Sequence, residues 1–209
     1  MSEQITAKMV KDLREATGAG PLDCKKALET NKGDFDKAVE YLREKGLARA
    51  AKKLGAGRAM NEGVIEVYSH HNQRLGAMVE VNCETDFVAN TPRFRNFAHD
   101  VALQIANLAP EYVRRKDVPD AVVQAERELQ RRRVLDEGKK ETVADKIVDG
   151  RMEKFFQEIV LLEQPFIKDD SRTISQMLSE LVSEVGESIE IRRFARFALG
   201  DTGAQDGNA

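Results

Sequence analysis

The apolar residues of this chain change their spacing at Gly63, from the period typical of helices to the alternation typical of strands. The segment Ala77–Glu84 alternates without interruption. One side carries Ala77, Val79, Val81 and Cys83, and the other Met78, Glu80, Asn82 and Glu84. Strict alternation indicates a strand with one buried face, because successive side chains point to opposite faces of a sheet. The rest of the chain must therefore supply strands that pair with this one and helices that cover it.

Two other segments are predicted strands. Val64–Ser69 precedes the central one, and 189–197 alternates again near the end of the chain. We expect Ile189, Ile191, Ala195 and Phe197 to share a face with Arg193. The three strands are predicted to form one small antiparallel sheet, with the intervening helices covering a single face. The fold class that we predict is α+β.

Helices are predicted between the second and third strands. Thr91-Pro92 is typical of a helix start. Residues of about 120–162 read as a helical hairpin around a polar turn at Gly138, and Ile174–Val185 as a final helix. The second arm of the hairpin carries a coiled-coil-like seam. That predicted seam consists of Val148, Met152, Phe155, Ile159 and Leu162.

The N-terminal region is predicted to be a separate small module. Residues 1–46 read as three short helices, the last ending near Gly46, a favoured residue at a helix end. Residues 47–62 read as a helical connector that loosens into a hinge at Gly55–Gly57. The core domain is predicted over 63–200, and 201–209 as a disordered tail.

Composition and charge indicate the cellular compartment of the protein. The formal net charge of −3 and the pI of about 5.8 provide no basic field that would draw the protein to nucleic acid. No apolar run reaches the roughly 18 residues that span a bilayer, and the first residues lack the features of a secretory signal. Cys24 and Cys83 lie in different segments and are expected to be reduced thiols. We therefore expect a cytoplasmic protein without membrane contact.

The segment Thr85–Asn90 does not fit the pattern around it. A strand-to-helix connection usually holds small and polar turn formers, whereas this one places Phe87 and Val88 beside Asp86. Phe87 could fold back onto the core, or it could stand at a rigid tip that inserts into a partner. Periodicity alone favours the first alternative.

Several motifs carry a resemblance to a known family. They include Leu13–Gly20, Asp23–Leu28, Ala50–Lys53 and, at the odd segment, Asn82–Ala89. Gly150-Arg151 with Lys154-Phe155, and Gln164-Pro165-Phe166, extend the series in the same order. With these motifs, spread from residue 5 to about residue 199, the chain resembles the elongation factor Ts family.

The resemblance implies a function. The fold would be a ubiquitin-associated-like three-helix module joined to an α+β core. The activity would be guanine nucleotide exchange on elongation factor Tu in translation elongation, with both the GDP-bound and the nucleotide-free partner bound. The segment formed by Thr85, Asp86, Phe87 and Val88 would enter the nucleotide domain of the partner and dislodge its Mg²⁺. Such a factor needs no catalytic group, metal or cofactor of its own.

Secondary contacts also follow from the resemblance. Arg14, Leu22 and Lys25 fall on matching positions of the N-terminal module, and His70 matches a histidine at a strand end. Relatives of greater length contain two copies of the core half-unit, and one copy is visible here. We therefore expect two chains to pair as a homodimer, by sheet faces or sheet edges, since the small sheet would otherwise expose an apolar face.

The sequence admits three rival functions, namely an enzyme, an RNA-binding protein and a ubiquitin-associated-like adaptor. An enzyme is disfavoured because Gly18-Ala19-Gly20 lacks the rest of a phosphate-binding loop and no nucleophile signature is present. An RNA-binding protein could use Arg114-Arg115-Lys116 and Arg131-Arg132-Arg133, but acidic residues flank both runs. A ubiquitin-associated-like adaptor would use residues 1–46 alone. A metal site at His70-His71 is disfavoured because adjacent strand residues point to opposite faces.

Overall fold

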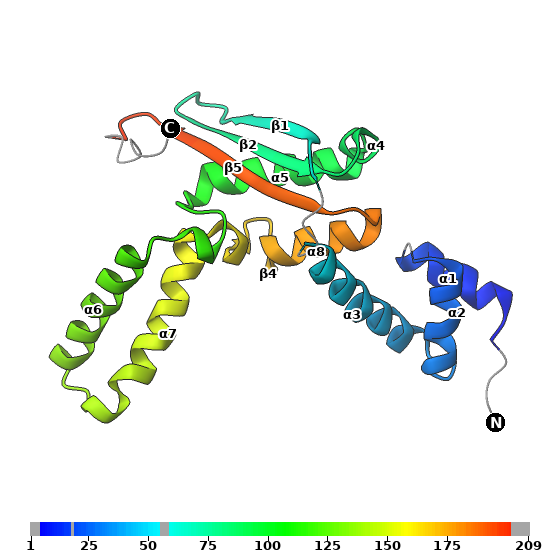
Figure 1. Ribbon diagram of the computed structural model, residues 1–209, viewed down its shortest axis with the longest axis horizontal. Coiled ribbons are helices and arrows are strands. Elements are labelled where there is room, and N and C mark those ends of the chain that lie inside the picture. Colours follow the sequence, from blue (N-terminus) through cyan, green and yellow to red (C-terminus); the bar gives the residue numbers. More distant parts are fainter. Residues whose placement is uncertain (1–4, 18, 55–58, 202–209) are drawn as a thin grey trace. The chain divides into compact units, whose positions relative to one another are not determined.

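The computed structural model describes residues 5–17, 19–54 and 59–201 (Figure 1). The chain has the α+β fold that was predicted. The N-terminal helices are α1 (Ala7–Thr17), α2 (Pro21–Thr30) and α3 (Phe35–Leu54). The later helices are α4 (Asp86–Ala89), α5 (Pro92–Leu108), α6 (Asp120–Asp136), α7 (Glu141–Ile159) and α8 (Ile174–Val185), with single 3₁₀ turns at Arg115–Asp117 and Leu161–Glu163. The predicted hinge at Gly55–Gly57 and the predicted tail beyond Asp201 lie outside the described residues.

The structure forms two compact units that alternate along the chain. Unit 1 combines the N-terminal region up to Gly63 with Asn82–Phe94 and Met177–Glu190. Unit 2 combines Val64–Val81, Arg95–Gln176 and the described residues from Ile191 to Asp201. The division into 1–46, 47–62 and 63–200 stays a prediction.

A small sheet of three strands organises the core. Its strands are β1 (Glu62–Ser69), β2 (Leu75–Cys83) and β5 (Ile189–Ala198), in the order β1-β2-β5. Arg74 O accepts a hydrogen bond from Leu199 N at 2.8 Å, and Arg193 reaches Glu80 at 2.7 Å. From the first contact to the second, the residue number rises from 74 to 80 along β2 and falls from 199 to 193 along β5. The two strands are therefore antiparallel, as predicted.

One face of the sheet is covered and the other is open. On β2, Ala77, Val79, Val81 and Cys83 are buried, as their alternation predicts. Helix α5 runs along this inner face (Figure 1) and buries its own apolar stripe. The buried residues of α5 are Phe94, Phe97, Ala98, Val101, Ala102, Ile105 and Ala106. The outer face carries residues that are largely exposed, namely Ile65, Val67 and Met78.

Strand β5 departs from its predicted alternation. Ile189 and Ile191 are buried, but Phe197 is 76% exposed, so these residues do not share one environment. Arg192 and Arg193 both reach Glu80, at 3.6 and 2.7 Å. Further along the strand Arg196 Nε donates to Ala106 O of α5 at 3.0 Å, so an even-numbered residue reaches the covered side that Ile189 and Ile191 occupy earlier. The prediction that one face runs unbroken through β5 is therefore wrong.

Helix α3 is longer than predicted. The prediction that the third helix ends near Gly46 is wrong, because α3 continues without a break to Leu54. Alanine, lysine and arginine dominate its last turns, and these residues favour helix over a glycine break. A Cβ atom at residue 46 would collide with the Ser183 side chain of α8. The glycine thus permits close packing of two helices instead of ending one.

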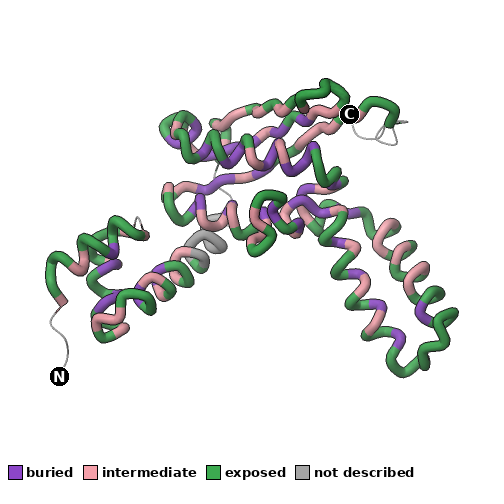
Figure 2. Tube along the Cα trace, turned by 180° about the vertical axis from the view of Figure 1, so that it is seen from behind, coloured by how far each residue is buried: buried purple, intermediate pink, exposed green. Residues whose placement is uncertain are grey.

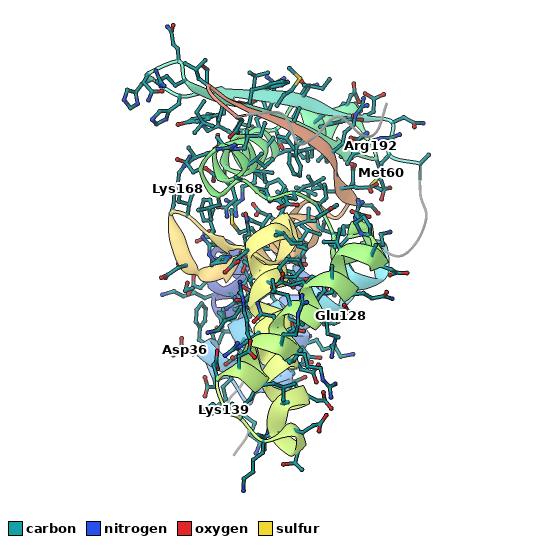
Figure 3. All side chains as sticks on the ribbon, turned by 90° about the vertical axis from the view of Figure 1, so that its left-hand side faces the viewer. Asp36, Met60, Glu128, Lys139, Lys168 and Arg192 are labelled. Carbon is teal, nitrogen blue, oxygen red and sulfur yellow. The ribbon has the colours of Figure 1, made fainter. Side chains whose placement is uncertain are left out.

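The predicted helical hairpin is present as α6 and α7. Buried positions recur along α7 (Figure 2), and Lys139 lies at the turn between the arms (Figure 3). The seam follows steps of four instead of the predicted alternation of four and three. Its members are Ala144, Val148, Met152, Phe156 and Val160, with Val134 the buried residue of α6. Phe155 and Ile159, placed in the seam by prediction, are half-buried beside it.

A short two-stranded sheet was not predicted. It pairs β3 (Pro165–Phe166) with β4 (Asp169–Thr173), and the polar sequence of β4 has no apolar alternation. Buried glutamines connect this segment to α5: Gln104 Nε2 donates to Gln164 Oε1 at 3.1 Å and to Pro165 O at 3.0 Å. At the turn of the sheet, Lys168 (Figure 3) pairs with Asp100 of α5 at 2.6 Å. Polar contacts, not an apolar pattern, therefore determine where the segment lies.

Arg115 anchors the base of the hairpin. Its guanidinium donates to both oxygens of Glu163, at 2.6 and 2.7 Å, and to both oxygens of Glu153, at 2.7 and 3.0 Å. The guanidinium carbon also lies 4.2 Å from the centre of the Phe156 ring. The neighbouring guanidinium lowers the pKa of the Glu153 carboxyl. A planar cation bound on two edges and one face holds three segments together.

We predict that Arg115→Met lowers the free energy of unfolding by about 1 kcal/mol, because both ion pairs and the ring contact are lost. Arg131→Met is the control, since Arg131 bridges exposed Glu141 and Asp145 without such a ring; its expected cost is below about 0.5 kcal/mol. Urea unfolding measures both. The extra loss of unfolding free energy in Arg115→Met persists above the ordinary pKa of Glu153. It shrinks on acidification, because protonation of Glu153 removes its ion pair with Arg115 in the wild type. Equal costs for the two variants would contradict the anchoring role.

Candidate functional site

The segment that the sequence marked as unusual folds into a single helical turn. Helix α4 stands at the end of β2, directly before α5 (Figure 1). Thr85 is its N-cap, with extended backbone angles and a side-chain oxygen that accepts from Val88 N at 3.4 Å. At the other end the Asn90 side chain donates to Asp86 O at 2.9 Å. Short polar residues at both ends thus satisfy the backbone of the turn. We call Thr85–Asn90 the tip.

The side chains of the tip divide sharply by exposure. Val88 and Ala89 are buried, at 8% and 5% exposure, whereas Phe87 is 82% exposed and Asp86 is exposed beside it. The alternative in which Phe87 caps the core is therefore wrong, and Val88 and Ala89 take that place. An aromatic ring left almost entirely in water at the end of a capped turn is available for contact with a partner.

Two carboxylates join the start of the tip to the turn between α8 and β5. Glu187 Oε2 accepts from Thr85 N at 3.1 Å, and its Oε1 accepts from the Thr85 hydroxyl at 2.8 Å. In the opposite direction Glu84 Oε1 accepts from Ser188 N at 2.8 Å. The turn between α8 and β5 and the end of β2 are thereby joined by reciprocal hydrogen bonds.

The predicted secondary contacts of the N-terminal module are all on its surface. Arg14 lies in the last turn of α1, and Leu22 and Lys25 lie at the start of α2. Leu22 is 83% exposed, and Lys25 makes only a loose ion pair with Glu29, at 3.8 Å. Beneath them, the module has its own core of Leu13, Cys24, Ala27, Leu28, Ala38 and Leu42. These three residues are thus available for contacts, and their role stays a prediction.

Comparison with known proteins determines the family. A family model described as Elongation factor TS matches residues 2–201. Elongation factor Ts of Carboxydothermus hydrogenoformans is 57% identical over 197 residues, which cover 94% of this chain and 90% of that protein. The proteins of the same name from Heliobacterium modesticaldum and Desulforamulus reducens are 55% and 52% identical over 94% and 95% of this chain, and over 91% and 90% of their own lengths.

The chain belongs to the elongation factor Ts family. The resemblance drawn from the sequence motifs is therefore confirmed. The roles of the tip residues and of the secondary contacts in this chain stay predictions that need their own tests.

His70 occupies a more constrained place than the sequence indicated. It lies at the end of the β1–β2 hairpin, and Nδ1 shares a hydrogen bond of 2.9 Å with the Tyr68 hydroxyl. The rings of His70 and His71 are 4.2 Å apart, so the expectation that they point to opposite faces is wrong. The reason is that His71 belongs to a turn and not to the strand. No group of three or more potential metal ligands gathers within the described residues.

Three of the six cations in the basic runs considered for RNA binding are engaged in the structure. Arg114 donates to Ile191 O at 3.1 Å, Arg115 makes the anchor described above, and Arg131 bridges two carboxylates of α7. Cations already paired with protein acids have less to offer phosphates. A search of the described helices finds none with the length and apolar character needed to cross a membrane.

Sequence reasoning missed Glu187 and Glu84, which support the tip. Glu187 is separated from Thr85 by 102 residues, and no spacing rule connects them. Glu84 follows the alternation of β2 and reads as an ordinary exposed strand residue. The only local signal is Gly186 after α8, which predicts a helix end and says nothing of what the next side chain contacts.

Cys83 lies immediately before the tip and is fully buried. Burial, with a further contribution from the Glu187 charge, raises the pKa of its thiol to about 11. The thiol points at the tip, since Cys83 Sγ donates to Thr85 O at 3.1 Å. Removal from water and a nearby negative charge both disfavour the thiolate, which is the reactive form.

We predict that Cys83 in the folded protein reacts with a disulfide reagent at pH 8 at least about a hundredfold more slowly than in denaturant, because the thiol stays protonated. Reaction in Cys24→Ser isolates this residue. Raising the pH toward 11 should accelerate the reaction as the thiol ionises. Rapid labelling of the native protein at pH 8 would contradict the burial described here.

Proposed function

We propose that this protein is a guanine nucleotide exchange factor for elongation factor Tu, acting in translation elongation in the cytoplasm. The single observation that carries the proposal is Phe87, 82% exposed on a helical turn whose other apolar residues are buried. An exposed aromatic residue on a fixed support is typical of a binding hot spot. Membership of the elongation factor Ts family supports the choice of partner.

In the proposed mechanism the tip enters the nucleotide domain of elongation factor Tu. Phe87 wedges between helices of the partner, Asp86 accompanies it, and Thr85 and Val88 shape the turn. The displacement dislodges Mg²⁺, which tolerates little distortion of its octahedral oxygen ligands. GDP then leaves, and GTP can replace it.

Nucleotide exchange by this mechanism requires no catalytic group in this chain. Exchange is a coupling between two binding events, so a factor that weakens nucleotide binding binds the nucleotide-free partner more tightly by the same free energy. The protein is thus proposed to be a binding protein and not an enzyme, without a cofactor. Arg14, Leu22, Lys25 and His70 are proposed to make secondary contacts with the partner.

We predict that the wild-type chain accelerates release of fluorescent GDP from elongation factor Tu and that Phe87→Ala slows this release about 30-fold or more, the cost of a hot-spot aromatic residue. The free energy of unfolding should change by less than about 0.5 kcal/mol, because the ring is in water. Leu135→Ala, which removes an apolar side chain 41% exposed on α6, is the control and should retain exchange. If the protein were instead a ubiquitin-associated-like adaptor, the wild-type chain would not accelerate GDP release from elongation factor Tu.

We further propose that two chains form a homodimer through the outer faces of their sheets. Ile65, Val67, Met78 and Phe197 are between 48% and 76% exposed on this face. Charges of both signs, on Glu80, Arg192 and Arg193, lie at its β5 side. A second copy presents the same apolar residues and opposite charges across a two-fold axis, which suits a self-complementary contact.

We predict that the wild-type chain sediments as a dimer at micromolar concentration and that Val67→Lys raises the dissociation constant at least about tenfold, because two buried charges enter each interface. Val143→Lys changes a residue of similar exposure on the hairpin and should leave the dimer intact. A wild-type monomer at that concentration would exclude this mode of association.

A further inference from the structure

The tip cannot hold its own shape. Helix α4 has four residues, and a single helical turn is unstable alone because its ordering entropy exceeds the gain from few hydrogen bonds. Phe87, its largest side chain, is 82% exposed and contributes little burial. The direction in which the ring points must therefore be determined by groups outside α4.

Glu187 is the group that contacts the start of the turn most directly. Its two oxygens accept both donors of Thr85, the backbone N–H at 3.1 Å and the hydroxyl at 2.8 Å. Because the hydroxyl proton is directed at Glu187, the lone pairs of the same oxygen remain for Val88 N, 3.4 Å away. The three groups form a chain of hydrogen bonds from carboxylate to cap to helix, and a charged acceptor strengthens it.

The support on which Glu187 stands is itself ordered. Gly186 adopts a φ of 77° and donates its N–H to Val182 O at 3.0 Å, which ends α8 sharply. Ser188, 1% exposed, donates its N–H to Glu84 at 2.8 Å. Residues on either side of Glu187 are thus fixed, so the carboxylate is presented to Thr85 from a rigid turn.

We propose that Glu187 is a positioning residue for nucleotide exchange, which holds the Thr85 cap and thereby the exposed Phe87 in the geometry that acts on the partner. This inference rests on the proposed function and deepens it. Glu187 is half-buried below the tip, so its effect is transmitted through Thr85. A preformed tip avoids the entropy of ordering at the moment of insertion.

The first test measures the tip without any partner. Hydrogen exchange of the Val88 amide should be about tenfold faster in full-length Glu187→Ala than in the wild type, because the cap is released. Glu184→Ala is the matched control: it removes a carboxylate of α8 that pairs with Arg93 at 2.9 Å and does not contact Thr85. Unchanged protection of Val88 in Glu187→Ala would overturn the proposed hold on the cap.

The second test separates positioning from stability. GDP release from elongation factor Tu is measured against factor concentration, giving a maximal rate and a half-saturating concentration. Glu187→Ala should lower the maximal rate about tenfold and shift the half-saturating concentration less than about threefold, since the docking residues are intact. A merely structural role would reduce the folded fraction, which raises the half-saturating concentration and leaves the maximal rate unchanged.

Two further variants complete the design. Glu187→Gln retains one carbonyl acceptor and should give an intermediate maximal rate. This variant replaces Glu187→Ala in the test if Glu187→Ala folds poorly. Thr85→Val combined with Glu187→Ala should cost no more than the larger single change, because both act on one hydrogen-bond chain. A full maximal rate in Glu187→Ala, or additive losses in the double variant, would overturn the inference. Absence of release by the wild type would instead reject the proposed function itself.

Discussion

The contact between the inner face of the sheet and α5 is the constraint on which the strand before the tip and the helix after it depend. Val79 and Val81 of β2 and Val101 and Ile105 of α5 are fully buried. Burial of four branched side chains provides several kcal/mol by area, on the order of 2 kcal/mol for each. Because β2 leads through the tip directly into α5, both ends of the tip are fixed by packing that the tip itself does not supply.

The two halves of β5 have different roles. In the first half, Ile189 and Ile191 are buried in the core. In the second half, Phe197 is exposed, and Arg196 donates to Ala106 O of α5 at 3.0 Å. A single strand thus completes the core and also contributes to the open apolar face. Between the halves, Arg192 and Arg193 both pair with Glu80 of β2.

Much of the fold could be predicted because its elements carry strong local signals. The alternation of Ala77–Glu84 predicts β2, Thr91-Pro92 predicts the start of α5, and α8 has the bounds that were predicted. Predictions failed where the deciding contact is distant. Gly46 looks like a helix end, yet close packing against Ser183 explains it, and β4 is held by pairing with β3 and not by its own pattern.

The candidate site shows the same division. Asn82–Ala89 could be singled out from sequence, since an aromatic residue beside a carboxylate is unusual in a strand-to-helix connection. Periodicity nevertheless favoured a buried Phe87, because an isolated apolar residue is buried more often than exposed. Val88 and Ala89 fill that place instead, and no periodic rule over so short a turn distinguishes one neighbour from the next.

The sequence by itself determined the main helices and strands, the family to which the chain belongs and the segment that we propose as its functional site. Those properties follow from residue type and local spacing. Only the tertiary structure decided that Phe87 is exposed to water, that β5 does not keep one buried face along its length and that Glu187 accepts hydrogen bonds from Thr85. The physical reason is that burial and hydrogen-bond partners depend on which distant segments meet, and a meeting across 102 residues leaves no periodic trace in the chain.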